Sequence, residues 1–165
     1  MERKKIIIGI KKSETVLRNL TGMDIIMEFD KLLISKLNNI INNKSYTLYQ
    51  TAISKEKKWD FYFTMLSDEF LKFLALVEHY SQIDTIEAED VLDSFLEIGN
   101  IICGNVISVL TSGHNEVKFA IPILLKSSEI KSLTVNAIKI KFEVKETDIT
   151  GYLLFAFNEG DRNVY

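Results

Sequence analysis

The sequence contains few of the residues that form cross-links and metal centres. It has one cysteine, Cys103, and two histidines, His79 and His114. One cysteine excludes a disulfide framework or a cysteine metal cluster within a single chain. Two histidines leave little material for a catalytic triad or a histidine-based metal centre, and no glycine-rich phosphate loop is present. We therefore expect no metal site and no cofactor of the protein's own.

The chain also lacks a basic surplus and a long apolar run. Its formal net charge is -3 at pH 7, with both signs interspersed. Nucleic-acid binding requires basic residues gathered on one face, so this composition argues against it. No window approaches the roughly 20 apolar residues of a membrane span, and the N-terminal apolar run is too short for a signal peptide. A reduced, cytoplasmic compartment without membrane insertion is the expectation.

Length and composition predict one domain with a sizeable core. The chain has 165 residues, 47% of them hydrophobic, and a single proline, Pro122. No linker, repeat or low-complexity segment divides it. We predict a single domain over residues 1–165, in which residues 1–23 form an extra strand and a connector and residues 159–165 form a disordered tail.

Apolar periodicity predicts both helices and strands. Helices are expected at 24–42, at 68–79 behind a capping Ser67, and at 86–110 behind a capping box formed by Asp84 and Glu87. Strands are expected at 4–12, 46–53, 59–66, 117–125, 136–144 and 151–158. Because helices and strands are segregated rather than strictly alternating, the predicted class is α+β, with a mostly antiparallel sheet packed against helices.

The helix predicted at 86–110 has two different faces. At about 100° per residue, one stripe is polar or small and the opposite stripe is apolar. The polar stripe holds Asp90, Asp93, Glu97, Asn100 and Gly104, and the apolar stripe holds Phe95, Ile98, Gly99, Ile102 and Val106. We expect Gly99 to let the core approach closely and Gly104 to leave room for a docking partner. Glu and Asn are also ordinary on a solvated helix face, so the pattern alone leaves that interpretation open.

The segment LEIGNIICGN resembles the signature of the chemotaxis phosphatase family that includes CheC, CheX and the phosphatase region of FliY. That signature has an acidic residue, two others, an asparagine, an apolar pair, a small residue and Gly-Asn. It is filled here by Glu97, Asn100, Ile101, Ile102, Cys103, Gly104 and Asn105. The order of elements over 24–158 is similar as well. Two-site members repeat the Glu-x-x-Asn pair on the first long helix. Asn38 follows Ser35 at that spacing and Asn39 follows Lys36, so the chain resembles the one-site, CheX-like branch.

The resemblance implies a hydrolase of the aspartyl phosphate on a CheY-like response-regulator receiver domain, in two-component signalling. The receiver would bring its own Mg²⁺. Asn100 would place the attacking water, and Glu97 would dock onto the receiver's active-site lysine. Gly104, Asp93 and Asn105 would lie on the partner-binding surface. Resemblance to CheX also implies a homodimer.

Two alternatives remain open at this point. A non-catalytic module would use the same helix to bind a receiver, or would sit in the flagellar switch. An unrelated α+β structural protein would carry Glu-x-x-Asn by chance. Neither the target receiver nor the pathway follows from the residues.

Overall fold

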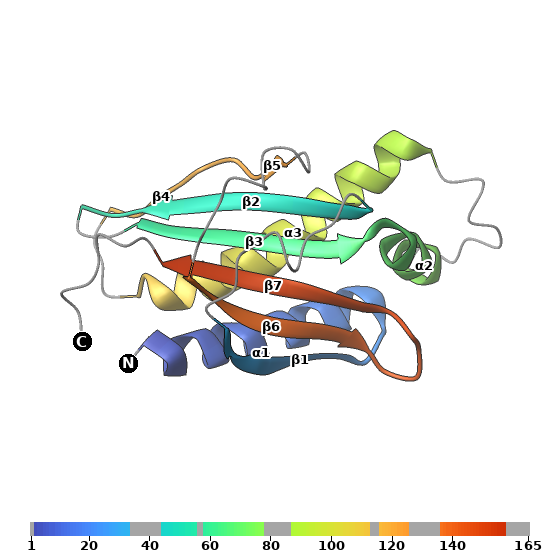
Figure 1. Cartoon of the computed structure of the whole chain (residues 1–165), viewed down its shortest axis with the longest axis horizontal. Coiled ribbons are helices and arrows are strands. Elements are labelled where there is room, and N and C mark those ends of the chain that lie inside the picture. The colour runs from blue at the N-terminus through green and yellow to red at the C-terminus, as the bar shows by residue number, and fades with distance from the viewer. Residues whose placement is uncertain are drawn as a thin grey trace.

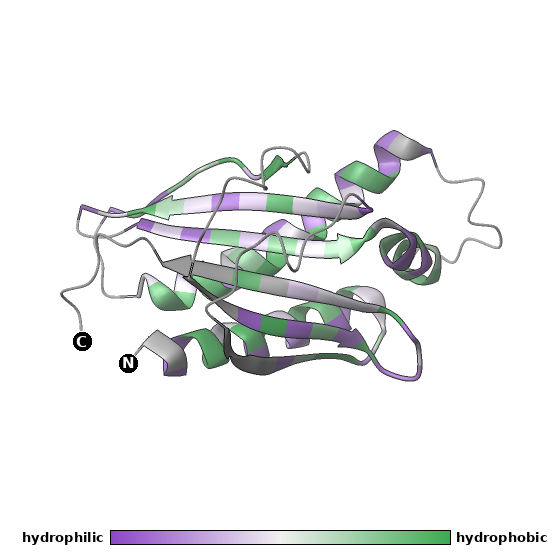
Figure 2. Ribbon diagram, viewed as in Figure 1, coloured by the Kyte–Doolittle hydropathy of each residue, from purple (hydrophilic) through white to green (hydrophobic). Residues whose placement is uncertain are grey.

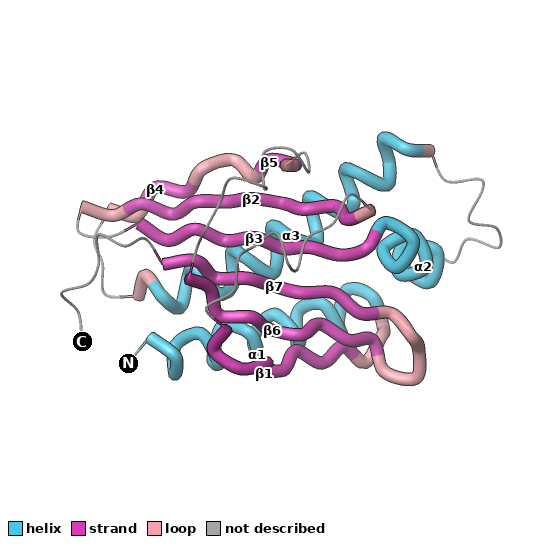
Figure 3. The backbone as a smooth tube through the Cα atoms, viewed as in Figure 1, coloured by secondary structure: helices cyan, strands magenta, loops and turns pink. Residues whose placement is uncertain are grey.

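The computed structural model describes residues 2–33, 44–55, 58–77, 87–112, 116–125 and 136–157 (Figure 1). Within them, seven strands form one antiparallel sheet in the order β1-β6-β7-β3-β2-β4, with β5 also paired to β2. Helices α1 and α3 lie side by side on one face of this sheet, and α2 follows β3 at the sheet's end (Figures 1 and 3). The α+β class with an antiparallel sheet is confirmed.

The elements have the following bounds. The helices are α1 Glu2–Thr21, α2 Ser67–Val77 and α3 Ala88–Leu110, and the strands are β1 Ile25–Leu33, β2 Ser45–Ile53, β3 Lys58–Leu66, β4 Lys118–Phe119, β5 Ile123–Leu124, β6 Asn136–Val144 and β7 Thr150–Phe157.

The strands predicted in the middle and at the end of the chain are confirmed. β2 and β3 pair from Ser45↔Leu66 to Ile53↔Lys58. β3 also pairs with β7, and its central residues are buried on both faces. β6 alternates hydrophobic and hydrophilic residues (Figure 2), and its Ile140 is fully buried. Local alternation of residue types predicted these strands, even though β3 is buried on both faces.

The N-terminal segment is a helix, so the predicted strand at 4–12 and the extra strand within 1–23 are wrong. Ile6, Ile10 and Leu17 of α1 are buried, whereas Ile7 and Ile8 are exposed. The buried residues recur at helical spacing. The three consecutive isoleucines at 6–8 favoured the strand prediction, because a run of β-branched residues is typical of a strand.

Helices α1 and α3 approach each other closely at Gly9. A Cβ added to Gly9 would lie 2.7 Å from the Cα of Val106. One turn further, Ser13 Oγ lies 3.0 Å from the carbonyl oxygen of Gly9 and 3.3 Å from that of Ile102 on α3. Contact with the α3 backbone therefore requires glycine at this position.

We expect Gly9→Ala to lower the free energy of unfolding by about 1–3 kcal/mol, because the added methyl overpacks the helix contact. Helix propensity alone would raise it by roughly 1 kcal/mol. Gly104→Ala is the matched control, since no described atom would lie within 4 Å of its Cβ. Chemical denaturation of both variants measures the difference. A Gly9→Ala variant as stable as Gly104→Ala would show that the close contact does not constrain the fold.

The helix predicted at 24–42 is also wrong, because residues 25–33 form strand β1. β1 pairs with β6, placing Ile25 opposite Val144 and Met27 opposite Phe142. Ile25 and Met27 are buried and Glu28 is exposed, which is strand alternation. The register then shifts between Phe29 and Leu32. Such a bulge breaks the period of two, so the apolar residues mimic helical spacing. Residues 34–42 lie outside the described residues.

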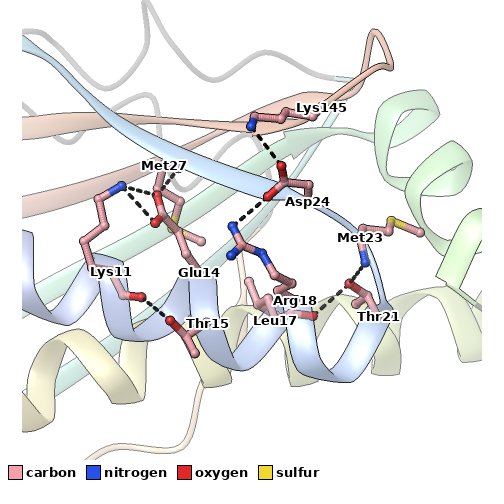
Figure 4. A network of polar contacts seen from close by, with 10 residues as sticks. All are labelled: Lys11, Glu14, Thr15, Leu17, Arg18, Thr21, Met23, Asp24, Met27 and Lys145. Atoms are coloured by element: carbon pink, nitrogen blue, oxygen red, sulfur yellow. Dashed lines mark hydrogen bonds and ion pairs between the residues drawn. The ribbon is translucent and has the colours of Figure 1, made fainter.

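Polar contacts join β1 to α1 and to the β6–β7 turn (Figure 4). Glu14, which is 8% exposed, accepts a hydrogen bond of 2.7 Å from the backbone N–H of Met27. Asp24 pairs with Arg18 at 2.6 Å and with Lys145 at 2.8 Å. The Lys145 hydrogen bond, with the charges of Lys145 and Arg18, lowers the pKa of Asp24. This contribution to stability is present above the ordinary carboxyl pKa and is lost as the pH falls through the lowered one.

The helices predicted at 68–79 and 86–110 are confirmed as α2 and α3, and their ends differ slightly from the predicted ones. α2 begins at Ser67 itself, and its predicted end at His79 lies outside the described residues. α3 begins at Ala88. Its N-cap, Glu87, makes no side-chain cap hydrogen bond, and Asp84 of the predicted capping box is not among the described residues. By length and composition, α3 meets the criteria for a membrane span, because an 18-residue window within Glu89–Leu110 has a mean hydropathy of 1.3. Buried core helices of soluble proteins meet the same criteria.

The strand predicted at 117–125 is divided in two. β4 pairs with β2 through Phe119↔Ala52, and β5 pairs with β2 through Ile123↔Tyr49. Pro122 lies between β4 and β5 and has no N–H to donate to the sheet, which disfavours one continuous strand. The break at 120–122 brings backbone groups of this segment next to the outer face of α3, as described below.

Candidate functional site

Helix α3 separates a core face from an outer face, as its sequence predicts. Phe95, Ile98, Ile102 and Val106 are buried, whereas Asp90, Asp93, Glu97 and Asn100 are exposed. A Cβ on Gly99 would lie 2.7 Å from Leu48 Cδ1 on β2, so Gly99 permits the close approach of α3 to the sheet. The packing of α3 thus leaves the Glu97 and Asn100 side chains outside the core.

Gly104 leaves the helix surface open beside this pair. It is half-buried, and no described atom would lie within 4 Å of an added Cβ. The neighbouring Asn105 is half-buried and donates Nδ2 to the carbonyl oxygen of Ile101, at 2.9 Å. Part of the Asn105 amide is therefore engaged with its own helix, while the Gly104 backbone is accessible to a partner.

Cys103 is poorly placed for nucleophilic chemistry. Its side chain is fully buried in the core, and burial raises the pKa of its thiol. A thiol that stays protonated is a poor nucleophile. Within the described residues, no group of three or more His, Cys, Asp and Glu side chains could hold a metal ion.

The amide of Asn100 is held by a residue that sequence reasoning missed. Gln50 on β2 is 4% exposed, and its Nε2 donates to Asn100 Oδ1 at 3.0 Å and to the carbonyl oxygen of Ala120 at 3.3 Å. The signal was present in β2, where Gln50 shares the inward face with Leu48 and Ala52. A polar side chain at a buried position needs a partner.

The exposed face of α3 presents two kinds of functional group, carboxylates and a carboxamide. Glu97 and Asp93 are carboxylates that can pair with a cation on a partner. Asn100 is a neutral carboxamide, which can donate and accept hydrogen bonds but does not take a proton. Together they are suited to docking a positively charged group and orienting a water molecule.

The first helix of the described chain is not the segment in which the sequence predicts one. The first helix is α1, not 24–42, and residues 35–39 lie outside the described residues. The single asparagine of α1 is Asn19, which follows Val16 at the relevant spacing. α1 therefore carries no Glu-x-x-Asn pair, and a single site stays a prediction for the chain.

The chain matches one protein-family model, described as "Chemotaxis phosphatase CheX", over residues 60–143. This match covers just over half of the chain and runs from β3 into β6, so it includes all of α3. A search of curated proteins finds no match.

Solved structures of low sequence identity share the fold. A CheX-CheY-BeF3-Mg²⁺ complex from Borrelia burgdorferi matches with a TM-score of 0.70 and 16% identity, over 96% of this chain and 99% of that chain. A chemotactic CheC-like protein from Shewanella oneidensis matches at 0.67 and 15%, over 96% and 100%. The FliM middle domain from Vibrio alginolyticus matches at 0.66 and 9%, over 95% and 93%.

These matches bear on the N-terminal segment and on the family. Coverage of 96% leaves little of the chain outside the shared fold, so α1 is part of that fold and not an addition to it. The family match includes the helix that carries Glu97 and Asn100. The chain therefore belongs to the CheX family of chemotaxis phosphatases.

Proposed function

We propose that this protein hydrolyses the aspartyl phosphate of a CheY-like receiver domain. The observation that carries the proposal is the exposed pair Glu97 and Asn100 on the outer face of α3, in a chain of the CheX family. The Borrelia relative supports it, since that CheX forms a complex with CheY, BeF3 and Mg²⁺.

In the proposed reaction, Asn100 orients the attacking water. An aspartyl phosphate is already reactive and the receiver brings its own Mg²⁺, so the phosphatase needs to add little beyond placing water in line with the phosphorus. The carboxamide of Asn100 can hydrogen-bond this water without carrying a charge. A carboxylate at the same position would repel the phosphoryl group.

Glu97 would hold the receiver against α3. Its exposed carboxylate pairs with the receiver's active-site lysine and fixes the helix over the phosphate. Gly104 lets the receiver surface approach the helix backbone, because it has no side chain to project between them. Asp93 and Asn105 would complete the contact surface, one turn before Glu97 and one residue after Gly104.

A phosphate-release assay tests this function. Each receiver encoded in the same genome is phosphorylated, and the loss of its phosphate is followed with and without the protein. We expect faster loss from at least one receiver, and an acceleration about 100-fold smaller with an Asn100→Ala variant of equal stability. If no receiver loses phosphate faster, the protein is not a receiver phosphatase.

A non-catalytic receiver-binding or flagellar-switch module is the second candidate. The structural likeness to the FliM middle domain favours it, because that protein has the same fold. Such a module would bind a phosphorylated receiver through α3 without shortening the lifetime of its phosphate. Measuring affinity alongside phosphate release separates the two functions.

A homodimer remains a prediction from the resemblance to CheX. β1 and the β4–β5 segment lie at the two edges of the described sheet, and sheet edges are able to pair with another chain. We expect light scattering to give a mass twice that of one chain. A monomer at high concentration would contradict the prediction.

A further inference from the structure

We propose that Gln50 is a positioning residue for Asn100, holding the Asn100 amide in one orientation on the outer face of α3. The effect on rate described below rests on the proposed phosphatase function. The orientation itself follows from contacts among Gln50, Asn100 and Ala120, and it is tested separately.

The backbone of Ala120 determines which way the Gln50 amide points. The N–H of Ala120 donates to the carbonyl oxygen of Thr51 at 2.8 Å, which fixes this peptide against β2. Its carbonyl oxygen can only accept, so the group of Gln50 that faces it at 3.3 Å must be the donor Nε2. A flipped Gln50 amide would place two oxygens against each other.

The orientation of Gln50 in turn determines that of Asn100. Because Nε2 is a donor, the Asn100 atom 3.0 Å away must be the acceptor Oδ1. The Nδ2 group of Asn100 then lies on the other branch of the amide, turned away from Gln50. The result is a relay from a backbone carbonyl through a buried amide to an exposed one, which leaves the Asn100 N–H donors and one lone pair of its oxygen for a water.

The stability of β2 does not explain why a glutamine occupies this buried position. Its Oε1 is buried without a hydrogen-bond partner in the described part of the chain. A buried acceptor without a partner destabilises the fold, whereas an apolar side chain of similar shape would not. Methionine has a similar length and lacks the amide, so exchanging the two residues separates the packing of β2 from the contacts of the amide.

Fixing the amide matters because in-line attack requires a narrow geometry. An exposed asparagine is free to change rotamer and to exchange the places of its nitrogen and oxygen. The hydrogen bond from Gln50 removes that freedom before the receiver arrives, so the water-binding group is already in place.

Gln50→Met is the test variant. At saturating phosphorylated receiver, we expect its rate of phosphate loss to fall about 10-fold, with receiver affinity unchanged and the thermal midpoint unchanged or raised. In an Asn100→Ala background, Gln50→Met should have no further effect on the rate, because the two residues act as one unit. An equal 10-fold loss in that background would overturn the proposal.

Thr47→Val is the matched control. Thr47 also contributes a fully buried polar group to β2, but its hydroxyl lies 3.1 Å from that of Thr64 on the neighbouring strand β3. By strand alternation it faces away from Gln50. We expect an unchanged rate for Thr47→Val. A rate loss equal to that of Gln50→Met would assign the effect to disruption of β2 and would overturn the positioning role.

A second readout does not depend on catalysis. The NMR order parameter of the Asn100 Nδ2 group should be higher in the wild type than in Gln50→Met, in which it should fall below about 0.6. Equal order parameters in the two proteins would refute the relay. If the wild type hydrolyses no receiver phosphate, the proposed function fails, and the order parameters still decide whether Gln50 positions Asn100.

Discussion

Replacing Asn100 with alanine should slow hydrolysis of the receiver phosphate about 100-fold while leaving receiver binding nearly intact. Asn100 is exposed and packs no core, so its removal costs little stability. The lost Gln50 hydrogen bond adds about 1 kcal/mol at most, because Nε2 keeps its contact with Ala120. Orienting water acts only at the moment of reaction, so the loss falls on the rate, at about 3 kcal/mol.

The measurement is the single-turnover rate of phosphate loss together with receiver affinity for each variant. Glu97→Ala is the informative comparison, because loss of the lysine partner should lower both affinity and rate. Asn100→Asp keeps the shape but adds a charge, so it should be as slow as Asn100→Ala or slower. If Asn100→Ala hydrolyses the phosphorylated receiver as fast as the wild type, Asn100 is not catalytic, and the binding-module function replaces the phosphatase.

Replacing Gly104 with leucine should weaken receiver binding about 10- to 100-fold without unfolding the protein. The space above Gly104 is open, so a leucine there meets no described atom near its Cβ. Leucine is also the better helix former, so the free energy of unfolding should hold or rise by up to about 1 kcal/mol. The leucine side chain would project beside Glu97 and Asn100 and would clash with the docked receiver. We expect this clash to weaken the free energy of receiver binding by about 1–3 kcal/mol.

Receiver affinity and thermal denaturation of Gly104→Leu measure the two parts of this prediction. Thr15→Leu is a suitable control, since it also places a leucine at an exposed helical position, but on α1. We expect wild-type affinity for Thr15→Leu. Unchanged affinity in Gly104→Leu would show that the outer stripe of α3 is not the docking face.

The sequence by itself determined the elements whose signals are local. The alternation of 46–53 and 59–66 on either side of a polar turn predicts β2 and β3, because side chains of a strand alternate between its two faces. The apolar stripe of Phe95, Ile98 and Ile102 predicts both α3 and the exposure of Glu97 and Asn100, because one helix face must be buried. The motif on that helix also predicted the family, which the match over residues 60–143 confirms.

Only the tertiary structure decided the state of the first 33 residues. The three consecutive isoleucines at 6–8 suit a strand, yet Gly9 packs on the Val106 backbone and makes the segment a helix. The apolar residues from Ile25 to Leu33 suit a helix, yet pairing with β6 around a register shift makes them a strand. In both segments the local preference is weak, and contacts with a distant element outweigh it.

The arrangement around Asn100 was likewise decided by tertiary structure. Gln50 and Asn100 are 50 positions apart, and Gln50 and Ala120 are 70 positions apart. No local window contains such a pair, so no periodicity or motif predicts it. The sequence identified the exposed amide. Packing of α3 over β2, with the broken strand at 120–122 beside them, determined which way that amide points.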